Sequence, residues 1–108
     1  MDKRIYKMHA DMCKVFTSPA RIEMLSLLGE GERTVGELVE LTGLRQPNVS
    51  QHLSVMKEKG IVTTNRVGNK VFYSLTNPKI SEAFRIIKEI LEDRLAESKG
   101  LYRSIKEV

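Results

Sequence analysis

The 108-residue chain contains no tryptophan, one cysteine and three prolines, and aromatic residues make up only 6% of it. One cysteine cannot form an internal disulfide, which fits a reducing compartment and leaves the thiol open to metal or redox chemistry. No apolar run approaches the roughly 20 residues of a membrane span, and the first residues lack the apolar stretch of a signal peptide. We therefore expect one small cytoplasmic domain with no membrane partner, too short for a multidomain enzyme.

The excess of positive charge lies in one third of the sequence. Of the 18 basic and 14 acidic residues, five basic and one acidic fall between residues 43 and 76. This stretch carries the whole formal net charge of +4, and the rest of the chain is neutral. Such a concentration is typical of a surface that contacts a polyanion, although a chance local excess would give the same count.

Helical periodicity and start signals predict three helices in the first part of the chain. Apolar residues recur at spacings of three and four over residues 3–17. Ser18 followed by Pro19 predicts an N-cap and the start of a second helix. Thr34 and Glu37 have the spacing of a capping box, which predicts a short third helix.

A longer fourth helix is predicted over residues 46–59, ending at Gly60. The short third helix, the glycine-containing turn and this helix form a helix-turn-helix pattern. After Gly60 the apolar period changes to two. The runs 61–65 and 70–75 predict a β-hairpin whose tip, residues 66–69, is basic.

A last helix is predicted from Asn77 and Pro78 to about residue 98, followed by a polar tail. Its length of roughly 33 Å at 1.5 Å per residue exceeds what a domain of this size needs for its own core. The first and last helices both carry apolar stripes. Together with this length, the stripes favour a homodimer over packing within one chain. The predicted dimer interface consists of Ile5, Met8, Met12, Phe84, Ile87, Leu91 and Leu95.

The face of the fourth helix opposite its apolar residues is polar but uncharged. Amide and hydroxyl side chains can read base edges in a DNA major groove, whereas an ordinary solvated face, the alternative, usually carries Glu and Lys. His52 lies at the edge of the apolar stripe; we favour packing and a hydrogen bond for it, with a phosphate contact left open. The outward and flanking positions are Pro47, Asn48, Ser50, Gln51 and Ser54.

Residues 16–25, 34–38, 44–53, 59–62 and 68–73 resemble, in order and spacing, the ArsR/SmtB family of winged-helix repressors. The most specific of these motifs is Val49-Ser50-Gln51-His52-Leu53. The resemblance implies a mainly α fold with a small β-hairpin, a winged helix-turn-helix of order α-α-α-α-β-β-α. It also implies a homodimer that binds an inverted repeat in double-stranded DNA, with the fourth helix in the major groove and the hairpin as the wing.

The resemblance also assigns candidate DNA contacts. Pro47 departs from the small hydroxyl residue usual at its position, which removes one polar contact. The domain would span residues 1–98, with residues 99–108 as the polar C-terminal tail. The recognition-helix candidates are Gln46, Asn48, Ser50 and Gln51, and the wing and phosphate candidates are Arg45, Arg66, Asn69 and Lys70.

Many members of this family release DNA on binding a metal, but the usual thiolate positions correspond here to Thr34 and Gly36, which cannot bind a soft metal. His9 and Cys13, four residues apart on one helix, are the remaining candidates. Two such pairs in a dimer would supply four nitrogen and sulfur ligands, suited to zinc or copper. The alternatives are a surface histidine beside a boundary cysteine, or a redox switch at Cys13. The effector stays open.

We therefore predict a sequence-specific DNA-binding transcriptional regulator, most simply a repressor. A winged-helix protein-interaction module without sequence-specific DNA binding is the alternative, disfavoured by the basic hairpin. An enzyme is not expected, because the sequence has no glycine-rich phosphate loop after a strand, and Cys13 and His9 share one helix rather than converging from different elements.

Overall fold

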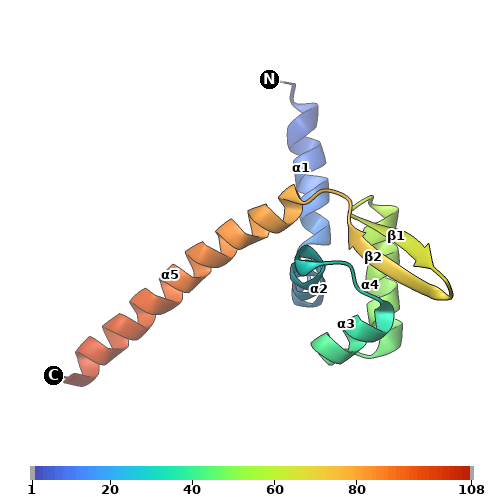
Figure 1. Cartoon of the computed structure of the whole chain (residues 1–108). Coiled ribbons are helices and arrows are strands. Elements are labelled where there is room, and N and C mark those ends of the chain that lie inside the picture. The colour runs from blue at the N-terminus through green and yellow to red at the C-terminus, as the bar shows by residue number, and fades with distance from the viewer. Residues whose placement is uncertain (1, 108) are drawn as a thin grey trace. The chain divides into compact units, whose positions relative to one another are not determined.

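The computed structural model describes residues 2–107, with side chains described as far as Gly100. The chain forms two units, one ending at Pro78 and the other beginning at Lys79. The order α-α-α-α-β-β-α and the two-stranded hairpin agree with the predicted winged helix-turn-helix. The elements of Figure 1 are α1 (Arg4–Val15), α2 (Pro19–Glu30), α3 (Val35–Thr42), α4 (Gln46–Glu58), β1 (Val62–Val67), β2 (Lys70–Leu75) and α5 (Lys79–Glu107).

Two helices of the first unit begin at the residues predicted to cap them. The Ser18 hydroxyl accepts a hydrogen bond of 3.4 Å from the backbone N–H of Arg21. The Thr34 hydroxyl accepts from the N–H of Glu37, and the Glu37 carboxylate accepts from the N–H of Thr34, each at 3.2 Å. The capping box predicted for α3 is therefore complete and satisfies two N–H groups that the helix itself leaves unpaired.

The turn between α3 and α4 is fixed by Gly43 and Thr42. Gly43 has a φ of 73°, in the left-handed region that glycine adopts without a steric penalty. The Thr42 hydroxyl donates to the carbonyl of Leu38 at 2.6 Å and accepts from the N–H of Leu44 at 3.2 Å. Arg45 is extended and precedes the first turn of α4. The two helices are thus joined by a short, hydrogen-bonded turn.

The core of the first unit is apolar throughout, and α1, α2, α3, α4 and β1 each contribute at least one buried residue to it. Among the described residues no polar or charged side chain is buried. Helix α3 contacts both α2 and α4, and α4 contacts β1. Because α4 directs three apolar side chains into this core, its opposite face is left exposed. The buried residues are Val15, Met24, Leu25, Leu28, Leu38, Val49, Leu53, Met56, Ile61 and Val62.

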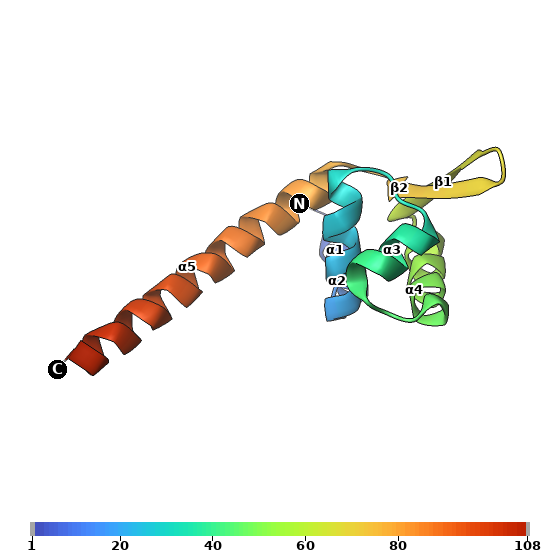
Figure 2. The ribbon, with the colours of Figure 1, turned by 60° about the horizontal axis from the view of Figure 1, so that its bottom comes forward.

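The hairpin is longer and its tip shorter than predicted. Strands β1 and β2 pair antiparallel out to Val67 and Lys70, so Arg66 belongs to a strand and the loop contains only Gly68 and Asn69. Gly68, with a φ of 63°, occupies the first loop position, where glycine is favoured in type II′ hairpins. Figure 2 shows the hairpin projecting from the helices of its unit.

A short backbone bridge attaches the hairpin to the connection between α2 and α3. The N–H of Arg33 donates to the carbonyl of Tyr73 at 3.0 Å, and the N–H of Tyr73 donates back at 2.8 Å. The Arg33 side chain donates to the carbonyl of Leu27 and pairs with Glu30. The base of the wing is therefore held by a third strand-like segment.

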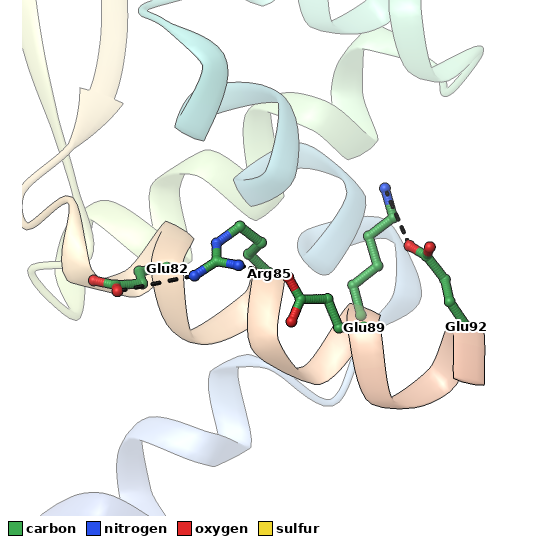
Figure 3. Close-up of polar contacts among 5 residues, drawn as sticks. Glu82, Arg85, Glu89 and Glu92 are labelled. Carbon is green, nitrogen blue, oxygen red and sulfur yellow. Dashed lines mark hydrogen bonds and ion pairs between the residues drawn. The ribbon is translucent and has the colours of Figure 1, made fainter. Parts of the chain in front are cut away.

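Helix α5 continues to Glu107, beyond the predicted end near residue 98. The helix therefore includes residues 99–107 of the segment predicted as a polar C-terminal tail, and Val108 lies outside the described residues. The residue least favourable to a helix after residue 98 is Gly100, which costs about 1 kcal/mol relative to alanine, and no proline follows it. Figure 3 shows exposed ion pairs of Arg85 with Glu82 and Glu89, and of a lysine with Glu92, along this helix.

None of the helices in the described part of the chain is both long and apolar enough to cross a membrane.

The cap of α3 gives a test of the fold. We expect Thr34→Ala to lower the free energy of unfolding by about 1 kcal/mol, because the N-cap hydroxyl is lost from the capping box. Urea unfolding followed by circular dichroism measures this. Ser26→Ala is the matched control, since Ser26 is exposed within α2 and its hydroxyl caps nothing. An equal loss in both variants would contradict the role of Thr34.

Candidate nucleic-acid interface

The outward face of α4 consists of uncharged polar side chains. Gln46, Asn48 and Gln51 are exposed, as are Pro47 and Ser54. Ser50, also predicted to contact DNA, is half-buried at the flank of this face. Val49, Leu53 and Met56 point into the core, so the helix is held from one side and presents amide groups on the other. Asn and Gln amides both donate and accept hydrogen bonds, as recognition of adenine in the major groove requires.

The basic side chains between residues 43 and 76 have no ion-pair partner in the described structure. In the described part of the chain every ion pair joins residues before position 34 or after position 81. The excess positive charge between residues 43 and 76 is therefore free to act on a ligand. The basic residues concerned are all exposed and comprise Arg45, Lys57, Lys59, Arg66 and Lys70.

The hairpin carries two of these charges close to its tip. Lys70 pairs with Val67 next to the loop, and Arg66 pairs with Val71 one step further back. The Arg66 Nε donates to the carbonyl of Gly68 at 3.3 Å, which folds the guanidinium toward the loop. The wing therefore ends in a compact positive surface that also contains the exposed Asn69.

Helices α2 and α4 are linked by a polar contact at the edge of the same surface. The Arg21 Nε donates to the Nδ1 of His52 at 3.1 Å, and both side chains are half-buried. Burial and, to a smaller extent, the positive charge of Arg21 lower the pKa of His52 below its ordinary value of 6.5. His52 is thus a neutral ring that accepts a hydrogen bond, in agreement with the favoured sequence interpretation.

Sequence reasoning did not find Arg21, Thr42 or Arg33 as structural partners of this surface. The partner of Arg21 lies 31 positions away on another helix, and periodicity within one helix cannot indicate such a contact. Thr42 had a local signal, because a threonine that precedes Gly43 can donate back to the last turn of α3.

The residues at the family's usual thiolate positions do not fit a soft metal. Thr34 is occupied in the capping box, and Gly36 has no side chain. His9 and Cys13 are exposed on α1. The described residues contain no group of three or more His, Cys, Asp or Glu that could hold a metal ion. Two donors from one chain do not complete a metal site.

Comparison with known proteins agrees with this architecture. Residues 18–64 match the family described as bacterial regulatory protein, arsR family. The chain is 40% identical over 97 residues to the uncharacterized HTH-type transcriptional regulator Rv0081 of Mycobacterium tuberculosis, covering 85% of each chain. It is 40% identical over 82 residues to the biofilm growth-associated repressor of Xylella fastidiosa, covering 76% of this chain and 71% of that one.

A solved structure shares the fold over nearly the whole chain. The crystal structure of M. tuberculosis Rv0081 covers 90% of this chain and 98% of its own, with a TM-score of 0.77 and 37% identity. The helix-turn-helix of α3 and α4, followed by the β1–β2 hairpin, therefore defines a winged helix-turn-helix protein.

Within this class the chain belongs to the ArsR family of bacterial regulatory proteins. It is a transcriptional regulator with a DNA-binding fold, which confirms the predicted class and the prediction that it is not an enzyme.

The lowered pKa of His52 makes stability depend on pH. As the pH falls through about 6.5, the unfolded chain protonates at His52 before the folded chain does, so the free energy of unfolding decreases. Urea unfolding at several pH values between about 7.5 and 5.5, above the range of most carboxylates, measures this. We expect His52→Gln to remove part of the decrease. A pH dependence identical to that of the original chain would contradict the assignment to His52.

Proposed function

We propose that this chain represses transcription by binding an inverted repeat in double-stranded DNA as a homodimer. The observation that carries the proposal is the exposed amide face of α4, within a stretch of chain that also carries five exposed basic residues without ion-pair partners. Relatives at 40% identity are described as a transcriptional regulator and a repressor. In this proposal the chain binds DNA in the cytoplasm.

In this proposal α4 enters the major groove with its N-terminal half. Gln51 lies at the centre of the outward face, and Gln46 and Asn48 lie in the first turn. These amides are suited to the edges of adenine bases, while the half-buried Ser50 is placed to donate from the flank. The α4 side chains would therefore supply the sequence specificity.

The basic residues would bind phosphates on either side of the groove. Arg45 precedes α4, while Arg66 and Lys70 lie near the tip of the hairpin with Asn69. Contacts of this kind position the protein but do not discriminate between sequences. We therefore assign these four residues to affinity rather than to specificity.

The apolar surfaces of α1 and α5 support a dimer. On α1, Ile5, Met8 and Met12 are exposed, and so is Tyr6, with exposed fractions between 48% and 64%. Phe84 on α5 is half-buried. Large exposed apolar residues in such number mark an interaction surface. Those on α5 are Ile86, Ile87, Ile90, Leu91 and Leu95, of which Ile86 and Ile90 extend the predicted interface.

A response of the chain to a soft metal would also depend on the dimer. His9 and Cys13 of two copies together would supply four nitrogen and sulfur donors, provided that the α1 helices meet. A thiophilic metal or an oxidant would have to act through Cys13, because it is the only cysteine in the sequence.

Two substitutions separate base reading from phosphate binding. Gln51→Ala should weaken binding to the correct site by about 1–3 kcal/mol and leave binding to random DNA unchanged. Lys70→Ala should weaken binding to both duplexes equally and make the salt dependence shallower, by a slope of about 0.9 for each phosphate that is no longer neutralised.

Fluorescence anisotropy with the duplex upstream of the protein's own coding region and with a random duplex, at several salt concentrations, measures both effects. An equal loss on the two duplexes for Gln51→Ala would reject its role in specificity. Affinity of the original chain that does not change with salt would reject DNA binding by the basic surface.

The dimer is tested by placing a charge in its apolar surface. Leu91→Glu should shift the chain from dimer to monomer in sedimentation experiments, and DNA binding should weaken at least tenfold because the two half-sites are no longer bound together. Ala96→Glu is the matched control, since it adds the same charge to α5 away from the apolar face. Dimers that persist in Leu91→Glu would exclude this interface.

A further inference from the structure

The hydrogen bond between Arg21 and His52 leaves several N–H groups of the two side chains without a hydrogen-bond partner in the described structure. In the described part of the chain, Arg21 Nε is the only guanidinium nitrogen of this residue with a hydrogen bond. No buried side-chain nitrogen or oxygen lacks a partner among the described residues. The Nη1 and Nη2 of Arg21 and the Nε2 of His52 therefore have no hydrogen-bond partner in the described structure and are not completely buried, although both side chains are half-buried.

These unpaired nitrogen atoms are all hydrogen-bond donors. Because Nδ1 of the neutral His52 ring accepts from Arg21, the proton of the ring is on Nε2. Nη1 and Nη2 of Arg21 carry four further N–H donors and a positive charge, and no acidic side chain pairs with it in the described structure. A charged cluster of donors without an acceptor matches an oxyanion, and arginine binds phosphate through two parallel hydrogen bonds.

The cluster lies beside the proposed groove-binding face. His52 directly follows Gln51 and lies one helical turn after Asn48, so it borders the side of α4 on which Asn48 is exposed. Arg21 reaches this edge from the first turn of α2. When a helix occupies the major groove, the phosphates of the bounding strands run along its flanks.

We propose that Arg21 and His52 together bind one DNA backbone phosphate at the edge of the major groove, in addition to the contacts of α4 and the wing. The proposal rests on the proposed DNA-binding function. It assigns a DNA contact to α2, which neither the helix-turn-helix pattern nor the charge excess between residues 43 and 76 includes. The hydrogen bond between the two side chains orients both donor groups before DNA binds, which reduces the entropy lost on binding.

The salt dependence of DNA binding tests this site on the full-length chain. Removal of one phosphate interaction from each protomer should lower the slope of log affinity against log salt by about 1.8 for the dimer, at about 0.9 per phosphate. We expect this change in Arg21→Gln, with equal losses of affinity on the upstream duplex and on a random duplex. Arg85→Gln is the matched control: it removes the same charge from a residue paired with Glu89 on α5, and its slope should stay that of the original chain.

Thermal unfolding of each variant separates phosphate binding from a purely structural role. Arg21→Lys keeps the charge and should keep most of the slope even if the unfolding temperature falls because the hydrogen bond to His52 is missing. If Arg21→Gln lowers affinity and stability but retains the original slope, Arg21 only positions α4 and the proposal is overturned.

The outcomes also distinguish this site from the proposed function. An original chain that binds both duplexes, together with an Arg21→Gln variant of unchanged slope, would overturn the phosphate site alone. An original chain that binds neither duplex would overturn both proposals.

Discussion

The burial of Val49, Leu53 and Met56 is the constraint on which the exposed polar face of α4 depends. These three side chains hold α4 against the apolar core, so the opposite face needs no contact of its own to keep the helix in place. Burying side chains of this size stabilises the fold by about 1.5–3 kcal/mol each. The exposed positions of α4 are therefore not needed for stability, and amide side chains that do not stabilise the fold are tolerated there.

The charged residues are also divided between a part of the chain with ion pairs and a part without them. Ion pairs in the described structure lie at α1, between Arg33 and the end of α2, and along α5. Exposed pairs of this kind contribute at most about 1 kcal/mol each to stability. Between residues 43 and 76 the positive charges have no ion-pair partners in the described structure. Their mutual repulsion is modest at physiological salt, because they are exposed and screened over about 8 Å. A polyanionic ligand would relieve this repulsion.

Local signals predicted most of the fold. Ser18 and Thr34 cap the helices that their spacing indicated, and the change of period after Gly60 marked the hairpin. The hydrogen bond between Arg21 and His52 and the bridge between Arg33 and Tyr73 could not be predicted, because each joins residues more than 30 positions apart through tertiary packing. The end of α5 was not predicted correctly because the polar composition after residue 98 suggested a tail. A polar composition by itself does not prevent a helix.

The capping box at the start of α3 also limits how this chain could change during evolution. In the ArsR/SmtB family the corresponding positions usually carry thiolates, but here Thr34 holds the first turn of the helix. A mutation that introduced a cysteine at this position would exchange a good N-cap for a poor one and weaken the helix that precedes the recognition helix. A metal response at this point of the fold therefore conflicts with stability, and a new effector site would arise more easily on another helix.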